Sequence, residues 1–384
     1  MKIMTPVKSL LAFILLWAGQ SQAAIFDCKE STSWPPKANV FTLNGVISVG
    51  DDIPVGSVVY RARLWAAAMG VRCTTPDGSG IGTELYIPSR VEVINTPASE
   101  VPGVTAPSVG EKVYETNVPG IGVSVTAEGK MPYEWATHRF TIISSTQSSS
   151  TATYARLELK LIKTGTVSPG IVNALNFPQL QVTFLTPTAP AGSTFTGFPI
   201  PYSTVSYNGT IQIVKSTCRA EVADKVVDLG SHEVKDIKND PQRVTTWTDA
   251  SLRLTGCQFS PGLYNLSNTS IYHVGTNDVG QGTPNANTVR LSLSASTSII
   301  DPLNGIIALT PESDSATGIG IQIGVKAGSE IQPYQFNMGD VIFTPTSPDT
   351  QSLDIPIFAR YKATSTTITP GKANGAVVYT LNYY

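Results

Sequence analysis

The chain has 384 residues, of which 14% are charged, and a formal net charge of −2 at pH 7. Its basic residues form neither an arm nor a run, which argues against nucleic acid and anionic membranes as partners, because both bind clustered Lys and Arg. Ser, Thr, Gly and Pro are plentiful, as is typical of extracellular β-sandwiches with many turns.

The first residues have the order of a secretory signal peptide. Lys2 and Lys8 give a basic start, residues 10–17 are apolar, and Ser21-Gln22-Ala23 is a small-x-small cleavage site. A membrane anchor is the alternative, but the apolar run is shorter than the roughly 20 residues of a spanning helix. We therefore expect residues 1–23 to be removed, leaving 24 basic and 28 acidic residues, a net charge of −4. We also expect export without a membrane or lipid anchor of the protein's own.

Period-two alternation of apolar and polar residues predicts many short strands. Residues 64–70 are a helix candidate. Strands are predicted at 91–94, 123–125, 140–143, 156–161, 180–184 and 209–214, with turns at Asp77-Gly78, Pro102-Gly103 and Asn208-Gly209. The predicted fold class is therefore all-β, with two antiparallel β-sandwich domains.

The boundary between the domains is predicted near residues 197–208, where an extended, proline-broken stretch precedes a new strand. This division gives a first domain at 24–203, a linker at 204–207 and a second domain at 208–384. Each side holds enough residues for one sandwich core. We expect the first domain to fold by itself.

Four cysteines in an exported chain favour disulfides. Sequence alone permits three pairings. Local pairing, Cys28 with Cys73 and Cys218 with Cys257, would place one disulfide in each domain. A metal site is the rival reading, but no Cys-x-x-Cys occurs and the three histidines are scattered. No metal or other cofactor is therefore expected.

From Asn208 onward the chain resembles the pilin domain of chaperone–usher fimbriae. The resemblance includes Val227-Asp-Leu-Gly230, Leu252-Arg-Leu-Thr-Gly-Cys257, Pro356-Ile-Phe-Ala-Arg-Tyr361 and a closing strand that ends at Tyr384. In that family a glycine stands fourteenth from the C-terminus and a tyrosine stands next to last, where this chain has Gly371 and Tyr383. Residues Gly371, Val377, Tyr379, Leu381 and Tyr383 share one parity, which predicts one face of a strand.

The resemblance implies an incomplete immunoglobulin-like sandwich that lacks its last strand, with those five residues along an open groove. Its implied partners are a periplasmic chaperone, an outer-membrane usher and a neighbouring subunit that donates its N-terminal strand. Gly371 would then leave room for the donor. The alternative is an ordinary immunoglobulin-like domain whose last strand simply ends the chain.

The first half resembles the receptor-binding domain of type 3-like and type 1-like fimbrial tip adhesins, in the segments 113–123 and 159–165. A whole domain stands where other subunits carry a free N-terminal extension, so the resemblance implies a capping subunit. The protein would then be exported through the periplasm, displayed at the fimbrium tip and attached to a host glycan or glycoprotein. A matrix protein such as collagen is the alternative receptor.

An exported polysaccharide-processing enzyme is a remote alternative. Residues 78–82 are glycine-rich but lack the Lys-Ser/Thr of a phosphate loop, and no Gly-x-Ser-x-Gly occurs. Nothing ties His138 to Glu134 and Asp27 as a catalytic triad. We therefore expect that the protein is not an enzyme.

The candidate receptor site lies at residues 131–139, between predicted strands. Tyr133 and Trp135 could stack on sugars, while His138 and Arg139 could fix hydroxyl groups, and binding groups often converge on loops. The alternative is that the two aromatics fill the core where a strand begins.

Overall fold

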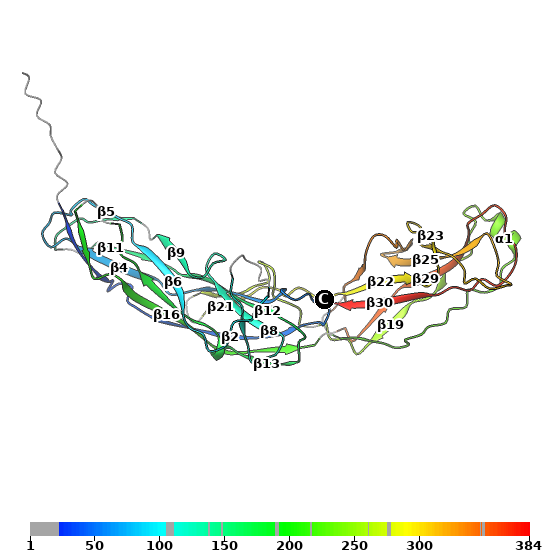
Figure 1. The fold of residues 1–384 in the computed structure, drawn as a ribbon, viewed down its shortest axis with the longest axis horizontal. Coiled ribbons are helices and arrows are strands. Elements are labelled where there is room, and N and C mark those ends of the chain that lie inside the picture. The colour runs from blue at the N-terminus through cyan, green and yellow to red at the C-terminus, as the bar shows by residue number, and fades with distance from the viewer. Residues whose placement is uncertain are drawn as a thin grey trace, which may run out of the picture.

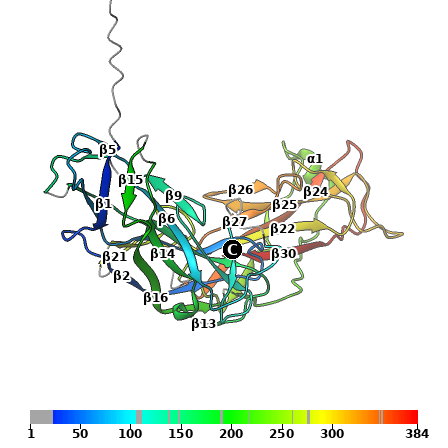
Figure 2. The ribbon, with the colours of Figure 1, turned by 60° about the vertical axis from the view of Figure 1, so that its left-hand side comes forward.

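The computed structural model describes residues 23–384, apart from 105–110, 137–138, 147–148, 189–191, 216, 260, 275–277, 346 and 348–349. The predicted signal segment, up to residue 22, lies outside the described residues. The molecule is elongated, with two β-rich bodies in a row and the C-terminus where they meet (Figure 1). The view turned by 60° again places the C-terminus between the bodies (Figure 2).

Three larger sheets and one short pair form the first body in the described part of the chain. The first sheet has the order β11 (Ser149–Thr153), β4 (Met69–Thr74), β1 (Ile25–Glu30), β15 (Thr194–Thr196). The second has the order β21 (Asp278–Gln281), β20 (Ile271–Val274), β3 (Val58–Trp65), β12 (Arg156–Lys163), β8 (Ile121–Thr126), β7 (Tyr114–Glu115). The third has the order β13 (Gly170–Asn173), β16 (Ile200–Val214), β14 (Gln179–Phe184), β6 (Pro88–Asn95), β9 (Tyr133–Ala136), with β2 (Ala38–Ser48) also on β16. The short pair is β10 (Phe140–Thr141) with β5 (Glu84–Leu85), and η1 (Ala174–Asn176) is a 3-10 turn.

The second body contains three further sheets among the described residues. Their orders are β17 (Arg219–Ala220), β19 (Leu252–Thr255), β28 (Ser352–Ile355); then β18 (Thr248–Asp249), β29 (Ile357–Ala363), β25 (Ile319–Ala327), β24 (Ile306–Ile307), β23 (Ile299–Asp301), with β26 (Glu330–Pro333) on β25; and β27 (Val341–Phe343), β22 (Val289–Ala295), β30 (Val377–Tyr383). A short helix, α1 (Val234–Asn239), which the sequence pattern did not predict, lies at the far end of this body (Figure 1).

Alternating burial explains the predicted strands that formed. Leu180, Val182 and Phe184 are all fully buried on one side of β14. Strand β12 contains the predicted strand 156–161 and lies between β3 and β8. The all-β fold class is therefore confirmed.

Both predicted disulfides are confirmed. Cys28 and Cys73 lie opposite each other on the antiparallel pair β1 and β4, and are buried. Cys218 lies directly before β17 and Cys257 lies after β19, and their disulfide closes the segment between them into a loop. Each body therefore has its own covalent link.

The structure differs from the predicted linker and turn. Residues 204–207 and Asn208-Gly209 all lie inside β16, whose residues 204–214 pair in parallel with the whole length of β2. Gly209 has a φ of +86°, and a Cβ there would lie 2.1 Å from the carbonyl oxygen of Leu43. The glycine is therefore required by a close approach of two strands rather than by a chain reversal.

A hairpin from the second half of the chain completes a sheet of the first body. We name residues 263–274 and 278–285 the docked hairpin; its ends are bridged at Leu263 and Asn285. Strand β20 of this hairpin pairs in parallel with β3. Ile271 is 2% exposed within the first core, and the Tyr264 ring meets the Tyr60 ring edge to face at 6.1 Å. A domain boundary at residue 208 would therefore assign β20 to the second domain, although β20 pairs with a sheet of the first body.

Three smaller expectations from the sequence also differ from the structure. The predicted helix at 64–70 is instead the end of β3, a short connection and the start of β4. Gly70 lies there because a Cβ would come within 2.9 Å of the carbonyl oxygen of Thr151 on the neighbouring strand. The predicted strand 140–143 is only two residues long, in β10. The sheets are mainly antiparallel, but β1 with β15, β2 with β16 and β3 with β20 are parallel pairs.

The described residues contain no helix with the length and hydropathy of a membrane span.

Candidate functional site

Tyr133 and Trp135 lie together on the edge strand β9. Their rings are stacked, with centroids 6.0 Å apart and an interplanar angle of 15°. The Trp135 indole Nε1 donates a hydrogen bond to Thr153 Oγ1 at 3.0 Å. Both rings are half-buried, so they are held in place but still present a surface to solvent.

Of the other two predicted residues, the structure describes only Arg139. Arg139 is exposed and pairs with Glu84, with 3.4 Å between Nη1 and Oε1. His138 lies outside the described residues. Of the four predicted residues, the structure brings Tyr133 and Trp135 together, and the receptor site itself stays a prediction.

Two neighbouring depressions lie in this region, and both aromatics line the first of them. The first has a volume of about 230 Å³ and is lined by Tyr133, Trp135 and Tyr154, together with Thr153, Ala127, Ala136, Glu128 and Arg156. The second has a volume of about 410 Å³ and is lined by Arg61, Arg63, Trp65, Glu128, Gly129, Arg156, Leu157 and Glu158. Glu128 and Arg156 line both, so the two depressions form one continuous surface. We call this surface the aromatic–arginine face.

The second depression lies on the outer side of the six-stranded sheet. Side chains alternate along β3 and β12, so Ala62, Leu64, Leu157 and Leu159 are buried while the charged residues between them point outward. Trp65 is 43% exposed and Tyr154 is 58% exposed. Exposed aromatics beside charged groups can bind a ligand by combined stacking and hydrogen bonding.

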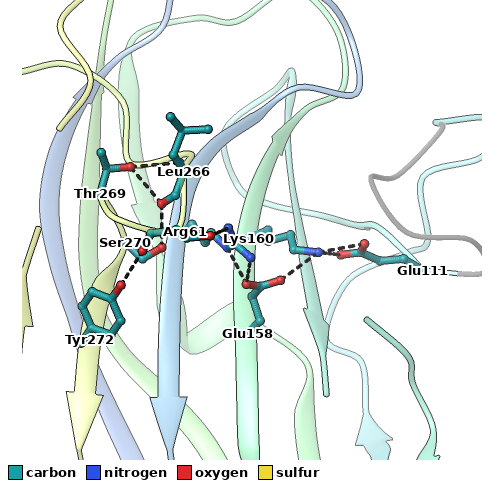
Figure 3. A network of polar contacts seen from close by, with 9 residues as sticks. Arg61, Glu111, Glu158, Lys160, Leu266, Thr269, Ser270 and Tyr272 are labelled. Atoms are coloured by element: carbon teal, nitrogen blue, oxygen red, sulfur yellow. Dashed lines mark hydrogen bonds and ion pairs between the residues drawn. The ribbon is translucent and has the colours of Figure 1, made fainter. Parts of the chain in front are cut away.

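Figure 3 shows a polar network that begins with Arg61 and Glu158 of the second depression. Glu158 binds Arg61 through one oxygen and Lys160, at 3.2 Å, through the other. Lys160 also reaches Glu111 at 3.1 Å, and both of these side chains are almost completely buried. Arg61 Nη1 donates to Ser267 Oγ of the docked hairpin at 3.4 Å, so the network links the two halves of the chain.

Sequence reasoning missed Arg63, Trp65, Tyr154, Arg156 and Tyr272. A usable signal was present in Arg61-Ala62-Arg63-Leu64-Trp65, whose alternation places all three long side chains on one face of a strand. The register between strands was needed to place Arg156 opposite Trp65, and the docked hairpin was needed to place Tyr272 opposite Arg63.

The C-terminal strand β30 forms the second candidate site. It pairs along one side with β22, and no ladder covers its other side among the described residues. Val377, Tyr379, Leu381 and Tyr383 are half-buried against the second core, while Val378 is 60% exposed. The strand therefore presents an open backbone edge and a partly covered apolar face.

Two tyrosines connect this strand to the segment that follows the first body. The Tyr379 hydroxyl donates to the Ala223 carbonyl at 2.8 Å, and the Tyr383 hydroxyl donates to the Cys218 carbonyl at 3.2 Å. Burial raises the pKa of Tyr383, with a further contribution from the negative charge of Asp52. These are side-chain contacts, so the backbone groups on that edge of β30 remain without a partner strand.

The first body meets the end of β30. The backbone N–H of Tyr383 donates to Asp52 Oδ2 at 2.8 Å. Lys163 donates to the Gly50 carbonyl at 3.0 Å, and burial lowers the pKa of this lysine. A Cβ on Gly50 would lie 2.3 Å from the Tyr383 carbonyl oxygen. The junction between the bodies is therefore closely packed at the end of the open edge.

Gly371 differs from its predicted position. It lies before β30 rather than on it, so four of the five predicted groove residues share the strand. A Cβ at Gly371 would come within 2.5 Å of Ala316 N and of the Asp314 carbonyl oxygen. In this structure the glycine makes room for the protein's own 314–316 backbone. Among the described residues, no group of three His, Cys, Asp or Glu side chains could hold a metal ion.

Comparison with known proteins finds a family match for the second half of the chain and a relative of the whole chain. Residues 205–384 match the family model described as Fimbrial protein. The chain is 25% identical over 387 residues to a fimbria adhesin protein of Klebsiella pneumoniae, and the alignment covers 98% of this chain and 100% of that protein.

Solved structures include similar proteins at low identity. The CupB6 tip adhesin from Pseudomonas aeruginosa is 15% identical, with 94% of this chain and 95% of that chain covered and a TM-score of 0.33. The CsuC–CsuE chaperone–tip adhesion subunit complex of Acinetobacter baumannii gives 12% identity, with 92% and 99% covered and a TM-score of 0.24. These matches indicate a structural adhesin rather than an enzyme, in agreement with the expectation from the sequence. This chain is therefore a fimbrial adhesin, similar over its whole length to the Klebsiella protein and matching the Fimbrial protein family model over residues 205–384.

Proposed function

We propose that the protein is the tip adhesin of a chaperone–usher fimbrium and attaches bacteria to a host surface through the aromatic–arginine face. It would pass through the periplasm, bind a chaperone and the outer-membrane usher there, and be displayed at the fimbrium tip. The observation that carries the proposal is the open edge of β30, because it supplies a place for one further strand.

The fibre would hold the protein by strand addition along β30. A donor strand would pair with the free backbone groups of this edge and place its side chains against Val377, Tyr379 and Leu381. A subunit in this state exposes both backbone and apolar groups, which favours aggregation. The chaperone, and later the neighbouring subunit's N-terminal extension, would cover that edge.

Fusion of a donor strand tests the fibre attachment. The neighbouring subunit's extension is joined after Tyr384 through a linker long enough to return antiparallel along β30. We expect a soluble monomer with a strongly raised melting temperature, whereas the unfused chain aggregates without its chaperone. A full chain that is stable and monomeric without an added strand would contradict the proposal.

Adhesion of fimbriated bacteria tests the receptor face. We expect Trp135→Ala to reduce attachment to host cells, because it removes the stacked ring and its bond to Thr153. Arg139→Ala distinguishes this face from the site predicted from the sequence, which includes Arg139. Because Arg139 pairs with Glu84 and lines neither depression, its loss should leave attachment through this face unchanged. Undiminished attachment by Trp135→Ala bacteria with normal fimbriae would remove this face as the receptor site.

A further inference from the structure

Two arginines on the aromatic–arginine face lie over aromatic rings. The Arg63 guanidinium lies 5.6 Å from the centre of the Tyr272 ring, and the Arg156 guanidinium lies 6.0 Å from the centre of the Trp65 ring. Neither arginine forms an ion pair with any of the described residues. Stacking holds a guanidinium in place while leaving its N–H groups available at the edge of its plane.

The carboxylate opposite Arg63 is already occupied. Glu158 stands opposite Arg63 across the β3–β12 pair, but its two oxygens bind Arg61 and Lys160. Lys160 is itself fixed by the buried Glu111. Both oxygens of Glu158 are therefore taken by the network in Figure 3, which leaves the Arg63 guanidinium for another acid.

The strand register places the two arginines as diagonal neighbours. Arg156 is opposite Trp65, and Arg63 lies two residues before Trp65 on β3. Diagonal neighbours on a sheet face are about 7–8 Å apart, a separation that one or two sugar rings can span. Both arginines line the same depression, and Arg156 continues into the one that holds Tyr133 and Trp135.

We propose that this face binds an acidic oligosaccharide, with its carboxylate or sulfate groups on Arg63 and Arg156 and a sugar ring on the Tyr133–Trp135 pair. Planar guanidinium groups bind carboxylates and sulfates through paired hydrogen bonds. Glu128 lines both depressions and carries a negative charge, so the unit beside it is a neutral sugar. The inference deepens the proposed adhesive function and rests on it.

The docked hairpin belongs to this site. Tyr272, which supports Arg63, comes from β20 in the half of the chain that matches the fimbrial family. The binding face is therefore composed of both halves, and the first half alone lacks one of its aromatic supports.

Titration of the full chain with defined saccharides tests the inference. The probes are sialyllactose for a carboxylate, a heparin tetrasaccharide for sulfate, and lactose as the neutral counterpart. We expect at least one acidic probe to bind and lactose to bind at least about tenfold more weakly, because a hydrogen bond to an ionised group contributes about 1.5–3 kcal/mol. The acidic probe that binds identifies which anion the site recognises.

Variants then assign the binding to the two arginines. We expect Arg63→Ala and Arg156→Ala each to weaken acidic-probe binding about tenfold or more, by the same hydrogen-bond magnitude. Arg156→Lys retains the charge but loses the planar fork, so it should bind with intermediate strength. Arg72→Ala is the matched control, because Arg72 lies on a different sheet and donates to the Glu30 carbonyl. The Arg72→Ala variant should bind the acidic probe with the same affinity as the unaltered chain.

The outcomes separate the inference from the function on which it rests. Equal binding of lactose and the acidic probes, or unchanged binding in both alanine variants, overturns the acidic-ligand inference. Binding of a collagen peptide by both the unaltered chain and the arginine variants, with no acidic saccharide bound by the unaltered chain, also overturns it but leaves adhesion intact. Bacteria that carry normal fimbriae with this tip and attach to no host surface would instead overturn the proposed function.

Discussion

A chain cut after Ser203 should fail to fold, although the sequence predicted a domain boundary at that point. The cut removes residues 204–214, which form the entire parallel ladder with β2. It also removes four side chains that are at most 3% exposed in the first core: Val205, Tyr207, Ile211 and Ile213.

The loss is comparable with the whole stability of a typical domain. Burying a large apolar side chain stabilises a fold by about 1.5–3 kcal/mol, so four of them contribute about 6–12 kcal/mol. Single domains are stable by about 5–15 kcal/mol in total. The cut also leaves the buried Leu43 and Ile47 of β2 without the strand beside them. The fragment 24–203 should therefore lack a stable native state.

Two fragments with the same disulfide provide the comparison. Residues 24–203 and 24–215 both contain Cys28 and Cys73, so any difference in stability comes from β16. Urea unfolding followed by near-ultraviolet circular dichroism should show a cooperative transition for 24–215 and none for 24–203. Equal unfolding midpoints would refute the assignment of 204–214 to the first core.

Three further predictions concern His273, Gly209 and Lys160. Burial lowers the pKa of His273, so as the pH falls the unfolded chain binds this proton before the folded chain does. The melting temperature of the full chain should therefore fall as the pH drops below about 6.5 towards the lowered pKa. The variant His273→Phe should reduce this pH dependence. Gly209→Ala should destabilise the first body by more than about 1 kcal/mol in urea, because it combines a positive φ with a clash against the carbonyl of Leu43. Lys160→Met should cost about 3–5 kcal/mol by leaving the buried Glu111 carboxylate without its lysine. A double variant that also carries Glu111→Leu should regain most of that stability, and a double variant as unstable as the single one would contradict this reasoning.

Local patterns predicted local structure well. The alternation in 180–184 gave a strand with three fully buried side chains, and the distribution of cysteines gave both disulfides. The pairing of distant strands was not predictable in the same way. Asn208-Gly209 has the composition of a tight turn, yet Gly209 serves the approach of β2 to β16. A glycine that permits a turn and one that permits close strand contact have the same sequence signature.

The candidate site shows the same limit at the level of side chains. Tyr133 and Trp135 were predictable because one short strand carries both. Arg63, Arg156 and Tyr272 come from three strands whose order in the sheet differs from their order in the chain. Each of them looks like an ordinary outward-facing residue of a half-buried strand, and only the register places each beside its partner. A site on the face of a sheet is specified by strand pairing, so a search for contiguous motifs finds only the members that share a strand.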